Sequence, residues 1–265
     1  MLSIFKKPAK SFLEFTAAFL SYLKGMNFPS KYEWRMKFEM LFGFYEKETV
    51  ALCEKMIKPG MNIIDAGAHI GYYSIIFSKL AGPRGIIFVF EPEPVNLKLL
   101  LKNTGKYANI KVIPMAVSNQ TGSVEFYRGD GYTGCHGLSP ASFRPEKIKV
   151  EATTLDSFTD EIGSPRIDLV KIDIEGAEPL AFQGMGQLIQ NNPAIMLILE
   201  FCPENLHLAK AEPKEFLDQL KSAGFNIFLI TDNGQLESIK DNNEFLKNIG
   251  MILKKDNFVN LFCRK

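Results

Sequence analysis

Short apolar runs alternate with amphipathic segments from Met61 onward, and this alternation limits the fold more than any other feature of the chain. It is typical of a parallel sheet with helices on its faces. Strands are predicted at residues 63–66, 86–90, 110–114, 124–127, 148–152, 168–172, 194–199, 225–230 and 258–263. Helices are predicted at residues 69–80, 177–190 and 213–223, and another opens at residues 91–94. We therefore expect a doubly wound α/β fold with a sheet of about seven strands, in which residues 124–127 form a small inserted β segment.

The composition is that of an ordinary folded protein. The 265 residues include 31 Lys and Arg against 30 Asp and Glu, a formal net charge of +1. A dedicated nucleic-acid binder carries a larger positive excess, so no nucleic-acid partner is expected. Hydrophobic residues make up 46% and charged residues 23% of the chain, which excludes a disordered or fibrous protein.

The cysteines and histidines do not form a metal motif. Cys53, Cys135, Cys202 and Cys263 lie far apart without a CxxC pair, and the three histidines also lack ligand spacing. We interpret the cysteines as reduced thiols, which favours a cytoplasmic protein. A run of about 18 apolar residues is absent from the sequence, so a membrane-spanning helix is not expected.

Residues 1–58 precede the alternating pattern and are predicted to form an N-terminal helical cap, while residues 59–265 form the main domain. Apolar residues recur at helical spacing within the cap: Phe12, Phe15, Phe19, Leu20 and Leu23. Three lysines precede them: Lys6, Lys7 and Lys10. Glu14 interrupts the apolar run and no small-residue cleavage site follows, unlike in a signal peptide. This helix either packs on the main domain, which is the favoured interpretation, or contacts a membrane surface through residues 6–25.

The first predicted strand runs into a turn with one acid and two glycines, Asp65-Ala-Gly-Ala-His-Ile-Gly. Gly67 and Gly71 lack a Cβ atom, so the backbone can approach a ligand closely. Glu91 ends the second strand, where a carboxylate accepts hydrogen bonds from both ribose hydroxyls of an adenosine-type ligand. The dinucleotide pattern GxGxxG lacks its second glycine, and Asp65 repels a pyrophosphate but attracts a cation. The charge therefore favours S-adenosylmethionine, which carries a sulfonium and an ammonium.

Further blocks occur in order along the chain. They are Phe90-Glu-Pro-Glu-Pro, Ala116-Val-Ser, Thr154-Leu-Asp, Lys171-Ile-Asp-Ile-Glu-Gly-Ala-Glu and residues 193–200. Together with the glycine turn they resemble FkbM-type methyltransferases over residues 60–200. The resemblance implies a class I S-adenosylmethionine-dependent fold with an antiparallel last strand. It also implies methyl transfer, usually to a hydroxyl of a sugar, glycolipid or polyketide.

The predicted donor-binding residues lie at the ends of the first three strands. They are Asp65, Gly67, Ala68, His69, Gly71, Tyr72, Glu91, Pro92, Ala116 and Val117. His69 stands where the family commonly has an asparagine, so the resemblance does not support a role for its side chain.

The strand that contains Lys171 is otherwise apolar, and a buried lysine needs a partner. The period of two places Lys171 and Asp173 on one side of this strand. If the strand lies between the first strand and the strand ending near Glu200, the carboxylates of Asp65 and Glu200 are within reach. Lys171 either belongs to a structural ion pair or, with Asp173, Glu175 and Glu200, frames the reacting centre.

Methyl transfer to an alcohol gains from a base that takes the hydroxyl proton. The candidates are Asp173, Glu175 and His136, the last within a long aperiodic segment, residues 128–146, that we interpret as a substrate loop or lid. An ion held by Asp173 and Glu200 is an alternative, but no spacing demands one and no metal site is predicted. Two other functions stay open, a non-catalytic methyltransferase-like scaffold and a nicotinamide-dependent oxidoreductase. Fold does not specify the acceptor.

Overall fold

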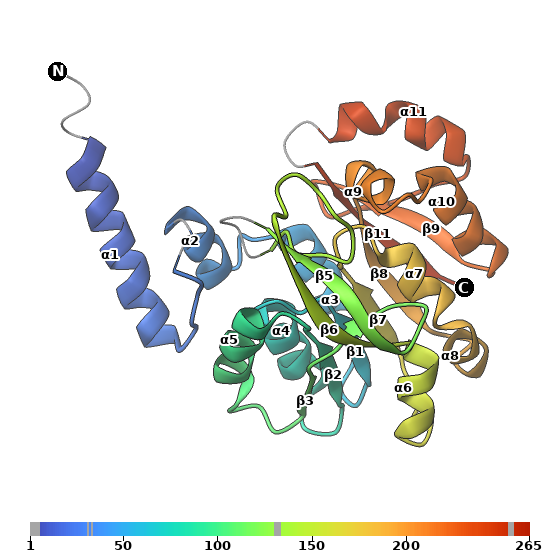
Figure 1. Cartoon of the computed structure of the whole chain (residues 1–265), viewed down its shortest axis with the longest axis horizontal. Helices are drawn as coiled ribbons and strands as arrows, with labels where there is room; N and C mark the ends of the chain where they lie inside the picture. Colours follow the sequence, from blue (N-terminus) through green and yellow to red (C-terminus); the bar gives the residue numbers. More distant parts are fainter. Residues whose placement is uncertain (1–5, 31, 33, 130–133, 254–256) are drawn as a thin grey trace.

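The computed structural model describes residues 6–30, 32, 34–129, 134–253 and 257–265 (Figure 1). Its main sheet has the strand order β10-β9-β11-β8-β7-β1-β2-β3. These strands are β1 (Ile63–Ala66), β2 (Ile87–Phe90), β3 (Ile110–Ile113), β7 (Leu169–Ile172), β8 (Met196–Phe201), β9 (Asn226–Ile230), β10 (Leu236–Ser238) and β11 (Val259–Arg264). The strands from β8 to β3 are parallel, and β11 runs antiparallel to both β8 and β9. The predicted α/β fold and antiparallel last strand are confirmed, and β10 is an edge strand that the pattern does not predict.

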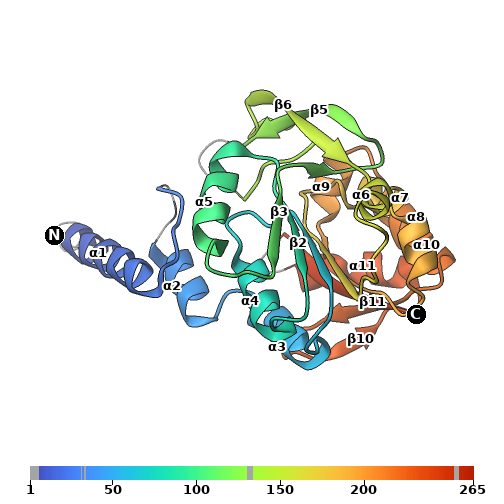
Figure 2. The same ribbon diagram turned by 90° about the horizontal axis from the view of Figure 1, so that it is seen from below.

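Helices cover both faces of the main sheet (Figure 2). The helices of the described residues are α1 (Lys6–Lys24), α2 (Trp34–Phe42), α3 (Lys47–Met56), α4 (Tyr72–Ala81), α5 (Pro94–Thr104), α6 (Leu155–Glu161), α7 (Glu178–Gln183), α8 (Gly186–Asn191), α9 (Pro203–Leu208), α10 (Pro213–Ser222) and α11 (Asn242–Ile252). Of these, α1 and α2 project from the side of the sheet (Figure 1). Successive residues of β1 serve opposite faces, because Ile63 packs with α3 and α4 while Ile64 packs with α6 to α8. The central strands β1, β2 and β7 are therefore apolar apart from Asp65 of β1 and Lys171 of β7, which makes them recognisable in the sequence.

Two predicted helices have different bounds in the structure. The helix expected at residues 69–80 begins only at Tyr72, because His69 and Gly71 have left-handed backbone with φ of 54° and 90°. The helix expected at residues 177–190 is divided into α7 and α8. The break lies at Gly184, where a Cβ atom would stand 2.4 Å from the carbonyl oxygen of Ser118. A close tertiary approach thus ends α7.

The predicted β insertion is a separate three-stranded sheet. It contains β4 (Ala116–Val117), β5 (Gly122–Arg128) and β6 (Glu146–Thr153) in the order β4-β6-β5. Phe126, Val150 and Ala152 form its small core. This sheet lies on one side of the main sheet, and Figure 2 shows it at the top, apart from the central strands.

The N-terminal helix packs through a different face from the one the sequence suggests. Ala17 and Ser21 are buried where α1 contacts α2. Of the face that we expected to pack, Phe12, Phe15, Phe19 and Leu23 are exposed instead and Leu20 is half-buried, while Tyr22 is also exposed. The packed face uses small residues, which lets the two helices approach closely. Among the described residues, no helix has both the length and the apolar character needed to cross a membrane.

Candidate active site

A cavity of about 450 Å³ lies at the carboxyl ends of β1, β2, β7 and β8. Open α/β sheets bind their ligands at this edge. Most of the predicted site residues line the cavity: Asp65, Gly67, Ala68, His69, Tyr72, Glu91, Pro92, Ala116, Val117, His136, Asp173 and Glu175. Gly71 does not line it. The topology therefore brings together residues from widely separated parts of the chain.

The two glycines of the β1–α4 turn are required by packing within the protein. A Cβ atom on Gly67, whose φ is 83°, would stand 1.8 Å from the carbonyl oxygen of Asp173. A Cβ atom on Gly71 would meet the side chains of Leu100 and Thr104 at 2.8 and 3.0 Å. We expected these glycines to make room for a ligand, and the structure assigns the room to neighbouring chain segments instead.

Glu91 lies at the end of β2 with its carboxyl group inside the cavity wall. The backbone N–H groups of His69 and Glu93 each donate to it at 2.9 Å. Burial raises the pKa of Glu91 to about 8, although these hydrogen bonds act in the opposite direction. The backbone contacts fix the carboxyl group where the sequence predicts contact with a ribose.

Lys171 is buried among carboxylates from three parts of the chain. Its Nζ lies 2.7 Å from Oδ2 of Asp173 and 4.5 Å from the ring centroid of Tyr73. Burial alone would lower the pKa of Lys171, but Asp173, Asp65 and Glu46 outweigh burial and raise it. As the sequence suggested, β7 lies between β1 and β8. The hydrogen-bonded partner of Lys171, however, is Asp173.

Asp65 keeps one carboxylate oxygen unpaired. The hydroxyl of Ser74 donates to its Oδ2 at 2.6 Å, whereas its Oδ1 has no hydrogen-bond partner among the described residues. Asp65 is fully buried and lines the cavity, and burial raises its pKa. A buried oxygen without a donor is costly to the protein alone, so this position suits a cationic or hydrogen-bond-donating ligand.

Asp173, Glu175 and Glu200 form a second acidic group on the side of β7 and β8. Each offers an oxygen atom within 4.8 Å of the others. Burial raises the pKa of Glu175 to about 8 and that of Glu200 well above its ordinary value, and the charge of Asp173 adds to both shifts. Three such oxygens suit a hard divalent cation as well as a shared proton. Sequence analysis predicted no metal here.

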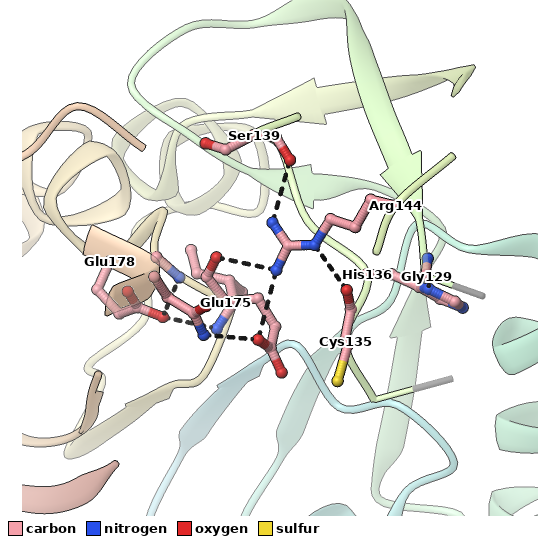
Figure 3. A network of polar contacts seen from close by, with 10 residues as sticks. Gly129, Cys135, His136, Ser139, Arg144, Glu175 and Glu178 are labelled. Carbon is pink, nitrogen blue, oxygen red and sulfur yellow. Dashed lines mark hydrogen bonds and ion pairs between the residues drawn. The ribbon is translucent and has the colours of Figure 1, made fainter. Parts of the chain in front are cut away.

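Arg144 joins the carboxyl group of Glu175 to the loop that contains Cys135 and Ser139, as Figure 3 shows. Its guanidinium donates to the carbonyls of Cys135 at 2.7 Å and Ser139 at 3.1 Å, and it lies 3.4 Å from Oε2 of Glu175. Asn205 donates to the same Oε2 at 2.8 Å. Glu175 also has left-handed backbone, with φ of 60°. The loop is thus anchored directly to the cavity wall.

His136 is poorly suited to take the hydroxyl proton of the molecule that receives the methyl group. Its Nδ1 already accepts a hydrogen bond from the N–H of Gly129 at 2.8 Å. Burial lowers the pKa of His136 to about 4, and the charges of Arg128 and Arg144 lower it further. Both observations favour Glu175 over His136 as the base.

Among the residues of the cavity wall that were not predicted, four come from the N-terminal region: Tyr32, Met40, Tyr45 and Glu46. The carboxylate of Glu46 accepts hydrogen bonds from Tyr73 at 2.8 Å and Asn260 at 2.7 Å. The hydroxyl of Tyr32 lies 3.2 Å from Nε2 of His69. Arg144 was also missed. None of these residues belongs to a motif, so spacing along the sequence gives no signal for them.

Comparison with known proteins decides the family. Residues 65–227 match the model of the methyltransferase FkbM domain. The chain belongs to this family. It is 27% identical over 191 residues to the 2-O-methyltransferase NoeI of Sinorhizobium fredii, covering 66% of this chain and 76% of NoeI. It is 26% identical over 162 residues to the hexuronic acid methyltransferase AglP of Haloferax volcanii, covering 60% of this chain and 61% of AglP.

The enzyme is therefore an S-adenosylmethionine-dependent methyltransferase, and the nicotinamide-dependent alternative is set aside. The site fits this donor on its own chemistry. The unpaired Oδ1 of buried Asp65 suits a ligand that brings positive charge or N–H donors. A cavity of about 450 Å³ also lies within the range that small-molecule ligands occupy.

Proposed function

We propose that the enzyme methylates a hydroxyl group of a sugar or a related polyhydroxylated small molecule, with Glu175 as the general base. One observation carries this proposal. The Glu175 carboxyl group lies in the cavity with a pKa of about 8, held by Arg144 and Asn205. A base whose pKa lies near the working pH combines an available carboxylate with useful proton affinity. The names of NoeI and AglP, which state 2-O-methylation and hexuronic acid methylation, support a sugar acceptor.

On the donor side, we propose that the cavity-lining residues of β1, β2 and β4 hold S-adenosylmethionine. The bound donor supplies an electrophilic methyl group. Asp65 would accept from its cationic end, and Glu91 from its ribose hydroxyls. Ala68, Pro92 and Val117 would contact the remaining surface, with the other donor-binding residues named above. Gly71 would act indirectly, since it shapes the turn without lining the cavity.

On the acceptor side, Glu175 takes the hydroxyl proton onto a carboxylate oxygen as the oxygen attacks. Asp173 lies beside it, and its negative charge raises the proton affinity of Glu175. Lys171 holds Asp173 in place through the contact at 2.7 Å. Phe126, Leu138 and Phe143 line the neighbouring wall and give it an apolar surface.

The charge of the cavity indicates a neutral acceptor. Seven of its described lining residues carry a carboxyl group: Glu46, Asp65, Glu91, Asp173, Glu175, Glu200 and Glu204. Lys171 is the single lysine among them, and Asp173 already pairs with it. An acceptor with its own carboxylate would find no lysine among the described lining residues other than this paired one, and the ionised Glu175 that the reaction requires would repel it. We therefore propose a neutral hydroxylated acceptor, unlike the acid named for AglP.

The cap belongs to the same proposal. Residues 1–58 would form a cap on a methyltransferase domain of residues 59–265. Tyr32, Met40, Tyr45 and Glu46 support this division, because they line the cavity although they lie outside the segment that matches the family.

Donor binding is the first test. Calorimetric titration of the wild type with S-adenosylmethionine, S-adenosylhomocysteine and NAD should show binding of the first two only. Glu91→Ala should weaken that binding. A folded protein that binds neither the donor nor its product would favour the non-catalytic scaffold.

The base is tested with Glu175→Gln against Glu204→Gln, which also changes a cavity-lining glutamate but leaves the acidic group intact. After neutral hydroxylated sugars have been screened for turnover, Glu175→Gln should lower kcat by roughly 10²- to 10⁴-fold. Its affinity for the donor should remain unchanged. In the wild type, kcat should rise as the pH passes through about 8, because the carboxylate form of Glu175 then accumulates. Equal kcat in the two variants would refute the role of Glu175.

A further inference from the structure

Helix α1 carries two apolar faces, and only one of them is covered by the described protein. The covered face, with Ala17 and Ser21, packs on α2. The other face exposes large side chains to solvent: Phe12 (69% exposed), Phe15 (71%), Phe19 (53%), Tyr22 (83%) and Leu23 (62%). We call these five residues the aromatic face. A contiguous apolar face of this kind on a soluble chain marks an interaction surface.

The aromatic face is held at a fixed place on the molecule. Figures 1 and 2 show α1 and α2 projecting from the side of the globular body. Asn27, just after α1, is tied to Asn103 of α5 by three hydrogen bonds of 2.7 to 2.9 Å. Lys24 donates to the carbonyl of Leu41 in α2. The helix is therefore joined to the main domain by specific polar contacts and is not a loose tail.

We propose that the aromatic face is a docking surface for an anionic lipid bilayer. Helix α1 contains four lysines, Lys6, Lys7, Lys10 and Lys24, and one acidic residue, Glu14. Basic residues combined with Phe, Tyr and Leu on one side are the features by which a helix lies in a membrane interface. Tyr22 suits this position because its ring is apolar and its hydroxyl is polar. The phosphate-rich surface supplies the negative charge that the lysines complement.

The same charges argue against a second copy of the chain as the occupant. Two α1 helices paired in parallel would bring the three N-terminal lysines of each copy together. An antiparallel pair would instead place Lys24 of each copy near the N-terminal lysines of the other. Cations meet cations in both arrangements, whereas an anionic bilayer brings only opposite charge to the lysine-rich start of the helix.

The test is co-sedimentation of the full-length protein with phosphatidylcholine vesicles, with and without an equal part of phosphatidylglycerol. The wild type should bind the mixed vesicles, and added salt should weaken the binding. The variant Phe15→Ser/Phe19→Ser should reduce the partition coefficient by about tenfold or more, because it removes two aromatic anchors. The matched control is Met251→Ser/Ile252→Ser, which removes two exposed apolar side chains from α11, on the side of the molecule away from α1.

Two outcomes would overturn the proposal. One is absence of binding to the anionic vesicles, or equal binding by both double variants. The other is a dimer of the wild type in sedimentation velocity that Phe15→Ser/Phe19→Ser converts to a monomer, which would assign the face to a second copy. Circular dichroism and calorimetric binding of S-adenosylmethionine confirm that each variant is folded.

Discussion

Gly67→Ala measures how tightly β1 and β7 approach at the edge of the cavity. The left-handed backbone at this position, with φ of 83°, costs an alanine about 1–2 kcal/mol of conformational free energy. Its Cβ atom would also stand 1.8 Å from a backbone oxygen, which must move. Forced displacement in a packed region costs about 1–3 kcal/mol. Gly67→Ala should therefore lower the free energy of unfolding by about 2–5 kcal/mol.

The matched control is Gly234→Ala in the turn between β9 and β10. Gly234 has φ of 73°, but a Cβ atom there meets no other atom within 4 Å. Gly234→Ala should therefore lower the free energy of unfolding only by the backbone strain, about 1–2 kcal/mol. Urea unfolding followed by circular dichroism gives both values. If Gly67→Ala destabilises the protein no more than Gly234→Ala, the backbone of Asp173 does not restrict this position and the argument is wrong.

Three further substitutions test the charged groups of the cavity. Lys171→Met should cost about 3–5 kcal/mol of stability, because Asp65 and Asp173 lose their buried cation; urea unfolding should show the deficit shrinking as the pH falls and the carboxylates protonate. Glu91 has a pKa of about 8 when folded against an ordinary 4.5, so it binds a proton on folding and its contribution to stability declines as the pH rises between these values. Glu91→Gln should flatten that decline in urea unfolding at about pH 5 and 9, and an unchanged slope would contradict the shift. In Arg144→Lys, the lysine cannot keep the planar guanidinium contacts to the carbonyls of Cys135 and Ser139. The KM for the acceptor should rise about tenfold, which corresponds to the free energy of about one hydrogen bond. The affinity for the donor, measured by calorimetry, should remain unchanged.

The central fold was predictable because its strands are buried on both faces. Ile63 and Ile64 of β1 are both fully buried although they serve opposite faces, so no solvent-facing position interrupts the apolar run. The period of two along β7 also placed Lys171 and Asp173 on one side, although the expected partners of Lys171 were Asp65 and Glu200 and its hydrogen-bonded partner is Asp173. Both results depend on local geometry that the sequence carries directly.

The features that the sequence did not predict, or predicted wrongly, depend on contacts between distant segments. The break at Gly184 depends on Ser118, and the place of Glu46 depends on Asn260, 214 residues away. The exposed face of α1 was misassigned because helical spacing shows which residues share a face but not which face finds a partner. Arg144 lies in an aperiodic loop, where neither the helical nor the strand period applies.

Because β11 lies inside the main sheet but comes last in the chain order of its strands, the sheet is completed late during synthesis. This strand lies between β8 and β9, and its Asn260 holds Glu46 in the cavity wall. A ribosome makes both neighbouring strands, and every acidic residue of the cavity, before it makes Val259–Arg264. Until then the emerging chain has the proposed catalytic groups but leaves one edge of β8 and one of β9 unpaired, which favours aggregation. We expect the chain to become fully folded and active in a single late step, when β11 inserts and closes the sheet. Chains halted before this strand should therefore require chaperones.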